Sequence, residues 1–292
     1  MRLPEFDFTE TQTLDEACRL MAGSGARPKL IAGGTDLMVN MKKGLVSPGH
    51  VVSISRLDEL KVMERSGGVF KLGACVAVSD LAESDEINES LGALGAGARA
   101  LGSPLIRNLA TIGGNLASAR PAADLPPSLM VYGSKASLAS VRGVREASLD
   151  GFFTGPGLTE IQPDEILTRI WVDIPKAGSG AGYLNIGVRK AQDCNLVNAA
   201  AFIALDDDEK TIRKARVVMG CVGPTQLRSP AAENVLTGEK VSDKLFESAG
   251  HAAAGDAMPV DDFRGCAEYK KDMAGVLTRR ALALALEAAR RG

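Results

Sequence analysis

The chain has few of the residues on which most catalytic and metal sites depend. Only two histidines occur in 292 residues, and the five cysteines are scattered without a Cys-x-x-Cys pair. A Ser-His-Asp or Cys-His arrangement needs a histidine beside the nucleophile, and zinc or iron–sulfur sites need clustered thiolates or imidazoles. The sequence therefore argues against hydrolysis and against a metal site within this chain. The scattered thiols are typical of reduced cysteines, most of which lie in cores.

Other absences narrow the class of partner. Lys and Arg number 34 against 36 Asp and Glu, so no basic excess marks a nucleic-acid partner. No apolar run approaches the roughly 18 residues that span a bilayer, and residues 1–10 hold acids and a proline where a signal peptide would be apolar. We therefore expect no nucleic acid, no membrane span and a cytoplasmic location.

What remains is the composition of an ordinary globular protein of mixed α and β structure. Hydrophobic residues make up 45% and charged residues 24%, and the length allows two or three compact units. Apolar periodicity and turn residues predict the main elements. These include helices over 13–22, 36–43, 85–101 and 266–290, strands over 29–32, 165–174 and 197–205, and a glycine-rich linker over 175–182.

Two glycine-centred loops about eighty residues apart are the most informative feature. They read Ala32-Gly33-Gly34-Thr35-Asp36 and Thr111-Ile112-Gly113-Gly114-Asn115. A Gly-Gly step admits positive φ and lets backbone N–H groups approach a phosphate, while the threonines and the asparagine add polar side chains. Each loop alone is more often a tight turn. Together they indicate a diphosphate held from two sides, without the P-loop or Rossmann fingerprint.

Three stretches of the sequence carry a resemblance to a known family. They are Ile31-Ala-Gly-Gly-Thr-Asp-Leu, then Ile106-Arg-Asn-Leu-Ala-Thr-Ile-Gly-Gly-Asn-Leu with an aspartate nine residues past its asparagine, and Arg264-Gly-Cys-Ala-Glu-Tyr-Lys. They resemble the FAD-binding medium subunit of the molybdenum hydroxylases, such as those of carbon monoxide dehydrogenase, 4-hydroxybenzoyl-CoA reductase and the xanthine dehydrogenases. The likeness covers nearly the whole chain.

The resemblance implies an α+β architecture of the vanillyl-alcohol-oxidase type. In such a fold two lobes hold FAD between them, and a smaller C-terminal α+β domain follows. For this chain it implies a first lobe over residues 1–55, a second lobe over 56–177 and a C-terminal domain of β-sheet and helices over 178–292.

The resemblance also implies the residues that bind the cofactor. The two loops contact the FAD diphosphate, and Asp124 lies near ribityl or ribose hydroxyls, the alternative for Asp124 being a helix N-cap. Leu101, Ala110 and Leu167 pack apolar surface on the cofactor, or else belong to the core. The full predicted set from the loops is Ile31, Ala32, Gly33, Gly34, Thr35, Asp36, Thr111, Gly113, Gly114 and Asn115.

A further segment corresponds to the part of the family that lies beside the isoalloxazine ring. Cys194 stands where relatives often carry a tyrosine or a branched aliphatic residue. Asn185 occupies the place of a basic residue found in some relatives, and Lys190 is the nearby cation that could compensate. A missing cation would weaken the stabilisation of an anionic reduced flavin.

The activity implied is electron transfer without acid–base catalysis by the protein, so no catalytic residue is assigned. FAD would be the cofactor, with a large molybdopterin-binding subunit and a small subunit holding two [2Fe-2S] clusters as partners in a dimer of heterotrimers. NAD, ferredoxin or a quinone would be the external electron carrier. Two alternatives remain: a flavin-free scaffold or nucleotide-binding subunit, and a stand-alone flavin oxidoreductase of the same fold.

The first prediction concerns iron. One branch of the family carries a cysteine-rich insertion for an extra [4Fe–4S] cluster, whereas the stretch from 124 to 144 here has no cysteine. We therefore expect FAD as the only redox group of this chain. Iron analysis of the isolated protein should find far less than one iron per chain, and stoichiometric iron would contradict the prediction.

Overall fold

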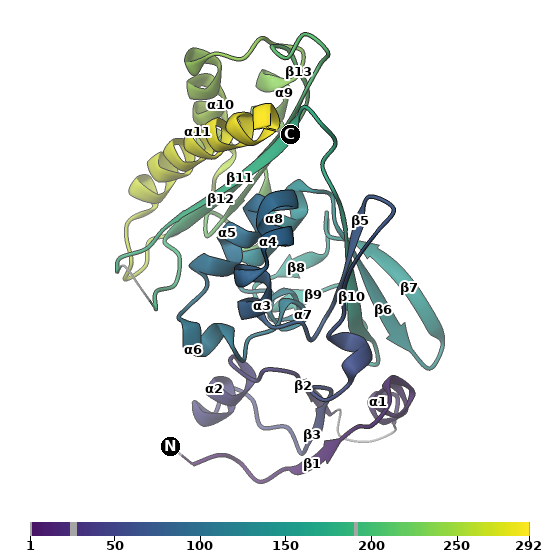
Figure 1. Cartoon of the computed structure of the whole chain (residues 1–292). Coiled ribbons are helices and arrows are strands. Elements are labelled where there is room, and N and C mark those ends of the chain that lie inside the picture. Colours follow the sequence, from purple (N-terminus) through teal and green to yellow (C-terminus); the bar gives the residue numbers. More distant parts are fainter. Residues whose placement is uncertain (1, 24–27, 190–191, 292) are drawn as a thin grey trace.

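The computed structural model describes residues 2–23, 28–189 and 192–291. Within this part of the chain, three larger sheets are arranged from the bottom to the top of Figure 1, in sequence order. The N-terminal sheet lies at the bottom, the middle sheet with its helices at the centre, and the C-terminal sheet at the top. The predicted division into 1–55, 56–177 and 178–292 stays a prediction, and each of these units contains one of the three sheets.

The N-terminal sheet is parallel, in the order β1 (Asp7–Glu10), β3 (His50–Ser53) and β2 (Lys29–Ile31). Thr13 caps α1 (Leu14–Met21), because its side chain accepts a hydrogen bond from the N–H of Glu16 at 3.1 Å. The strand β2 leads through the first glycine loop into α2 (Leu37–Lys42). The predicted strand, loop and helix are therefore present.

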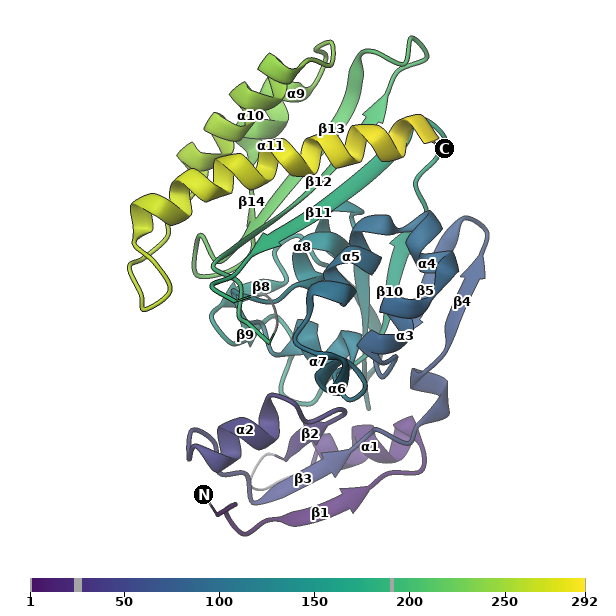
Figure 2. The ribbon, with the colours of Figure 1, turned by 60° about the vertical axis from the view of Figure 1, so that its left-hand side comes forward.

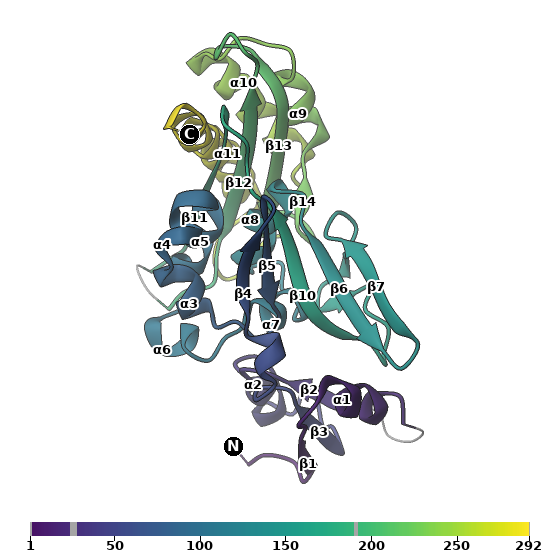
Figure 3. The same ribbon diagram turned by 45° about the vertical axis from the view of Figure 1, so that its right-hand side comes forward.

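The middle unit is an antiparallel sheet covered by short helices. Its strands lie in the order β4-β5-β10-β6-β7, as Figure 3 shows from the right-hand side. Buried Phe70 and Leu72 of the sheet and Leu94 and Leu129 of the helices meet in one core. The strands are β4 (Met63–Ser66), β5 (Val69–Gly73), β6 (Lys135–Ser140), β7 (Gly143–Ser148) and β10 (Ile166–Asp173), with a small hairpin of β8 (Phe153–Gly155) and β9 (Leu158–Thr159).

The helices of this unit are shorter than the sequence pattern predicts. The prediction of one helix over 85–101 is wrong, because Leu91 leaves the helical region with φ −130° and ψ 51° and divides it into two. The single turn at Asp58–Leu60 (η1) precedes the sheet. The helices are α3 (Val78–Glu83), α4 (Asp85–Ser90), α5 (Gly92–Ala100), α6 (Pro104–Arg107), α7 (Ile112–Ala117) and α8 (Leu125–Val131).

The C-terminal unit is an antiparallel sheet in the order β11-β12-β13-β14, crossed by the long helix α11 (Figure 2). The glycine-rich linker predicted over 175–182 is partly wrong, because β11 already begins at Ser179. Gly180 and Gly182 allow α11 to approach this strand, and a Cβ on Gly180 would lie 2.3 Å from the nitrogen of Ala289. The elements are β11 (Ser179–Ile186), β12 (Val197–Leu205), β13 (Ile212–Gly220), β14 (Leu227–Arg228), α9 (Pro230–Leu236), α10 (Asp243–Asp256) and α11 (Ala267–Arg291).

The C-terminal sheet is buried on both faces, which fixes its place on the middle unit. Ala199 and Ala201 of β12 face the helices of the C-terminal unit, whereas Ala200 between them joins the core of the middle unit. Tyr183 and Val218 from the neighbouring strands join that same core. This alternation is the period of a strand with two buried faces, so the C-terminal unit packs directly on the middle unit.

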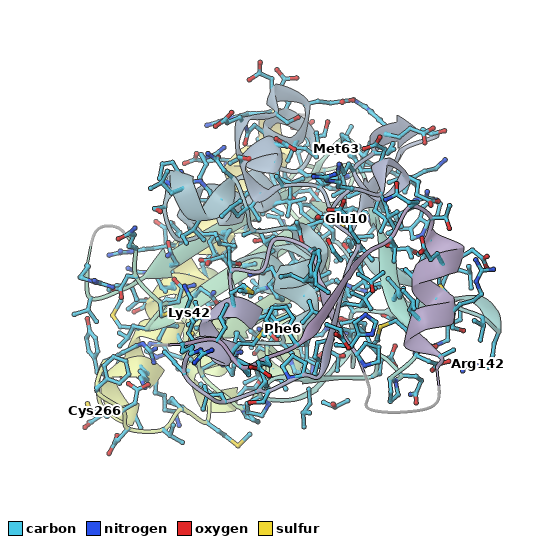
Figure 4. The ribbon with its side chains drawn as sticks, turned by 90° about the horizontal axis from the view of Figure 1, so that it is seen from below. Phe6, Glu10, Lys42, Met63, Arg142 and Cys266 are labelled. Carbon is cyan, nitrogen blue, oxygen red and sulfur yellow. The ribbon has the colours of Figure 1, made fainter. Side chains whose placement is uncertain are left out.

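A view from below looks onto the N-terminal sheet (Figure 4). Phe6 and Glu10 lie near the centre of this view, whereas Arg142 and Cys266 lie toward opposite edges. In Figures 1 and 2 the helix α2 of this unit lies below α6 and α7 of the middle unit. The two glycine loops approach each other where these units meet, since the backbone of Leu109 and Ala110 lies against Gly33.

Candidate functional site

Two adjoining cavities form a groove between the glycine loops. The first has a volume of about 600 Å³ and the second about 490 Å³. Both are lined by Lys29, Leu30, Ala32, Gly114 and Ala117, so they are two parts of one groove, which we call the loop groove. Its length and its apolar wall suit an extended ligand more than a compact one.

Most of the predicted binding residues line this groove. The first cavity is lined by Ile31, Ala32, Gly33, Gly34, Thr35, Asp36, Leu101, Ala110, Thr111, Gly114, Asn115, Asp124 and Cys194. The second is lined by Gly113 and Leu167 besides shared residues. Asn185 lines neither cavity, and Lys190 lies outside the described residues. The structure thus brings together residues that lie up to about 160 positions apart in the sequence.

The first loop offers unpaired backbone donors. Gly34 adopts φ +71°, which turns the chain from β2 toward α2. Within the part of the chain that the structure describes, the N–H groups from Gly33 to Asp36 make no hydrogen bond to a protein acceptor. Consecutive free N–H groups at a loop that opens a helix form a site for an anion.

The second loop is different, because it forms the first turn of α7. Thr111 caps this helix by accepting from the N–H of Gly114 at 3.1 Å, and the N–H of Gly113 donates to the carbonyl of Ala74 at 2.9 Å. The N–H groups of Ile112 and Asn115 are paired as well. Among the described residues only the N–H of Thr111 in this loop lacks an acceptor, so the loop does not offer a run of free N–H donors like that of the first loop. It supplies side chains instead, since the Oδ1 of Asn115 is buried without a hydrogen-bond partner among the described residues.

Asp36 connects the two loops. Its Oδ2 accepts a hydrogen bond from the Ser118 hydroxyl at 2.9 Å, and its Oδ1 lies 3.6 Å from the Nε of Arg120. Arg120 also donates to the Oδ1 of Asn40 at 3.2 Å. Sequence reasoning missed Ser118 and Arg120, which both line the groove. The only sequence feature that could have indicated them is that both follow the second loop within five residues.

Asp124 is a buried carboxylate in the wall of the groove. It is 8% exposed, and its Oδ1 accepts from the Tyr183 hydroxyl and from the Nδ2 of Asn195, both at 2.8 Å. Burial raises the pKa of Asp124 to about 6, although both hydrogen bonds act to lower it. Asp124 stands at the N-cap position of α8, but its side chain makes no cap hydrogen bond, so the alternative role as a helix cap is not formed.

Of the three residues predicted beside the flavin ring, Cys194 lines the groove. Cys194 is exposed and lines the first cavity together with Asp193. The N–H of Arg189 donates to Asp193, and such backbone hydrogen bonds hold the pKa of that carboxyl below its usual value. Asn185 instead donates to the Oδ1 of Asn195 at 2.7 Å, and Asn195 in turn bonds Asp124 in the groove wall. Contact of Asn185 with the cofactor stays a prediction.

Comparison with known proteins places this arrangement in a family. The model of the FAD binding domain in molybdopterin dehydrogenase matches residues 4–177, and that of the CO dehydrogenase flavoprotein C-terminal domain matches 183–285. The chain belongs to this FAD-binding family of the molybdopterin dehydrogenases. The predicted family, the α+β fold and the oxidoreductase class with FAD as cofactor are thereby confirmed.

Individual relatives match over nearly their full length. The chain is 32% identical to the nicotine 6-hydroxylase medium subunit of Paenarthrobacter nicotinovorans, over 97% of this chain and 98% of the relative. It is 29% identical to the carbon monoxide dehydrogenase medium chain of Hydrogenophaga pseudoflava, over 96% of each. A solved carbon monoxide dehydrogenase from the latter organism superposes with a TM-score of 0.94 at 31% identity, covering 99% of both chains.

The groove of this FAD-family chain fits a dinucleotide on its own chemistry. The free N–H groups of Gly33 to Asp36 suit a diphosphate, and the unpaired Oδ1 of Asn115 and the carboxylate of Asp124 suit N–H or O–H donors. Arg120 and Lys29 are cations of the groove wall.

Among the described residues, no group of three or more His, Cys, Asp or Glu could hold a metal ion. No helix of the described chain is both long and apolar enough to traverse a bilayer.

The second prediction concerns the contact between the loops. A Cβ on Gly33 would lie 1.6 Å from the carbonyl oxygen of Leu109, a clash of backbone with backbone. Gly33→Ala should lower the free energy of unfolding by about 2–3 kcal/mol and separate the loops. Gly49→Ala is the matched control, because nothing lies within 4 Å of its Cβ. Thermal unfolding measures both, and equal melting temperatures would contradict the prediction.

Proposed function

We propose that this chain is the FAD-carrying electron-transfer subunit of a multi-subunit molybdenum hydroxylase or dehydrogenase. The observation that supports this most is the complementary donor and acceptor set of the loop groove. Free N–H groups of the first loop face the same cavity as Asn115 and Asp124. The nicotine 6-hydroxylase and carbon monoxide dehydrogenase relatives support it as well, since one is named a medium subunit and the other a medium chain.

In this proposal each part of the groove holds one part of the cofactor. The first loop binds the diphosphate, and Asp124 accepts a hydrogen bond from a ribityl or ribose hydroxyl. The isoalloxazine ring lies at the end of the groove that Cys194 lines. The adenine then occupies the second cavity, where Leu167 and Ile166 supply apolar surface. Bound FAD supplies the redox chemistry, while the protein binds and orients it.

The partners follow from the same proposal. A large molybdopterin-binding subunit would act on the substrate, and a small subunit with two [2Fe-2S] clusters would connect that site to this chain, as a dimer of heterotrimers. NAD, ferredoxin or a quinone would be the external electron carrier. The electron-transfer role of this chain requires no acid–base catalytic group, which agrees with a sequence that contains only two histidines.

Co-purification and colour test the proposal directly. A native preparation should carry visible flavin absorbance together with a large molybdopterin protein and a small iron–sulfur protein. FAD should bind more tightly than FMN, because FMN lacks the second phosphate and the adenine. A protein that stays colourless after reconstitution with FAD would favour the flavin-free scaffold. Oxidase activity of the chain alone would favour a stand-alone flavoenzyme.

The third prediction concerns the charge of Asp124. A hydroxyl that donates to this carboxylate stabilises the ionised form, so FAD affinity should rise as pH rises through about 6 and fall below it. Asp124→Asn should weaken FAD binding about tenfold at pH 8 and make the affinity nearly independent of pH between 5 and 8. Fluorescence titration at several pH values measures both effects.

An exposed carboxylate serves as the control for this prediction. Asp58 hydrogen-bonds only Lys61 at 3.1 Å on the surface and lines neither cavity. Asp58→Asn should leave both the affinity and the pH profile unchanged. If Asp124→Asn kept the pH profile of the unchanged protein, Asp124 would not be the titrating group.

A further inference from the structure

One wall of the loop groove is held almost entirely by the C-terminal unit. This wall is the segment 120–124, which we call the wall segment, and four of its five residues line the groove. Each of its first four carbonyls accepts a hydrogen bond from a donor beyond residue 190. The bonds are Gln226 Nε2 to Arg120 O at 2.9 Å, Cys221 N to Pro121 O at 2.9 Å, Asn195 Nδ2 to Ala122 O at 3.0 Å and Asn198 Nδ2 to Ala123 O at 3.0 Å.

The fifth residue of the wall segment is Asp124, and its carboxylate is held by the same unit. Tyr183 and Asn195 both donate to Oδ1 at 2.8 Å. Asn198 donates to the Tyr183 hydroxyl at 3.2 Å, and Asn185 fixes the amide of Asn195 by donating to its Oδ1. Within the described chain, Oδ2 of Asp124 accepts no hydrogen bond, so it is the oxygen left for a ligand.

The N–H and O–H groups of Tyr183, Asn195 and Asn198 are buried and paired, whereas among the described residues the amide oxygens of Asn198 and Gln226 are buried without a partner. Tyr183 is 3% exposed, Asn195 5% and Asn198 0%. A buried amide or hydroxyl without a partner is unfavourable, whereas a paired network in low dielectric is strong and fixes one geometry. An apolar face would hold the two units together at a lower desolvation cost. Holding the middle and C-terminal units together therefore does not by itself explain why this interface contains a polar network.

We propose that the C-terminal unit completes the cofactor site, with Tyr183 and Asn195 as positioning residues that hold the wall segment and present Oδ2 of Asp124 to the ligand. The inference rests on the proposed function, because the ligand is taken to be FAD. It assigns a role in cofactor binding to a unit that lies outside both glycine loops.

The pH dependence of FAD affinity can report on Asp124, because the titratable groups packed against its carboxylate do not change charge near pH 6. From β11 Tyr183 faces the carboxylate, and burial raises the pKa of its hydroxyl well above the usual value. Beyond β13 lies Cys221, whose thiol pKa burial raises to about 12. Both stay uncharged near pH 6. The other charged residues of the first cavity are Lys29, Asp36, Arg120 and Asp193.

The fourth prediction is the test of this inference, made with the full chain and FAD as the probe. Tyr183→Phe removes one donor to Asp124 and keeps the ring. FAD affinity at pH 7 should fall about three- to tenfold. The midpoint of its pH profile should move upward, because the ionised carboxylate has lost a donor. A role confined to packing would leave that midpoint in place.

Two further variants make the test specific. Tyr132→Phe is the matched control, since Tyr132 is also buried and accepts a hydrogen bond from the N–H of Ala93 at 3.2 Å, but it does not contact the wall segment. It should leave the midpoint unchanged. Asn185→Ala is a substitution at an exposed residue that frees the amide of Asn195 to turn, and it should shift the midpoint in the same direction as Tyr183→Phe.

The outcomes separate this inference from the proposed function. If the unchanged chain binds FAD, but Tyr183→Phe and Asn185→Ala both behave like Tyr132→Phe, the positioning role is wrong and the FAD site remains. If the unchanged chain binds no FAD at all, the proposed function fails first. A shifted midpoint in both variants, with the control unmoved, supports the role of the C-terminal unit.

Discussion

The site depends on one close approach of backbone to backbone, at Gly33 and the carbonyl of Leu109. No side chain fits between them, since even a Cβ at Gly33 would overlap that carbonyl oxygen. This contact sets the distance between the N-terminal unit, which carries the first loop, and the middle unit, which carries the second. The hydrogen bond between Ser118 and Asp36 then joins the same two units on the other side of the loops.

In the proposed FAD site the two loops would contribute different groups. The N–H groups from Gly33 to Asp36 are unpaired among the described residues, whereas those from Ile112 to Asn115 are paired within α7 and with the residues after β5. Consecutive backbone donors for an anion are therefore concentrated in the first loop. The second loop would contribute the unpaired Oδ1 of Asn115, and the C-terminal unit would fix the carboxylate of Asp124 in the middle unit. A site built from three units orients a long ligand at several points along its length.

Sequence reasoning reached the parts of this site that local patterns encode. The glycines of both loops stand out because a turn or a close approach needs that residue type, whereas Asp124 was reached only through the family resemblance. The amide side chain of Asn115 was predicted to bind, but the sequence did not indicate that its Oδ1 is buried without a partner among the described residues. The paired N–H groups of the second loop were missed, because their acceptors, such as the carbonyl of Ala74, lie far from the motif in sequence. Tyr183 and Asn195 were missed for the same reason, since they reach Asp124 across 59 and 71 positions.

The fold shows the same division between local and distant causes. The capped helix at Thr13 and the strand, loop and helix around Gly34 follow from nearby residues. The segment with Gly180 and Gly182 resembled a linker in sequence. It forms a strand that needs these glycines because α11, about a hundred residues later, packs closely on it. Distant packing, then, decides both where this sequence departs from its local pattern and how the wall of the groove is held.

The central claim, that the run of free N–H groups in the first loop supplies most of the backbone donors to the FAD diphosphate, is tested most directly by millisecond amide hydrogen exchange with and without FAD. Binding should slow exchange of the N–H groups from Gly33 to Asp36 by about tenfold or more, because they gain acceptors only then. The already paired N–H groups of Gly113 and Gly114 should change much less. Protection confined to the second loop, or none at the first loop with FAD bound, would contradict the account.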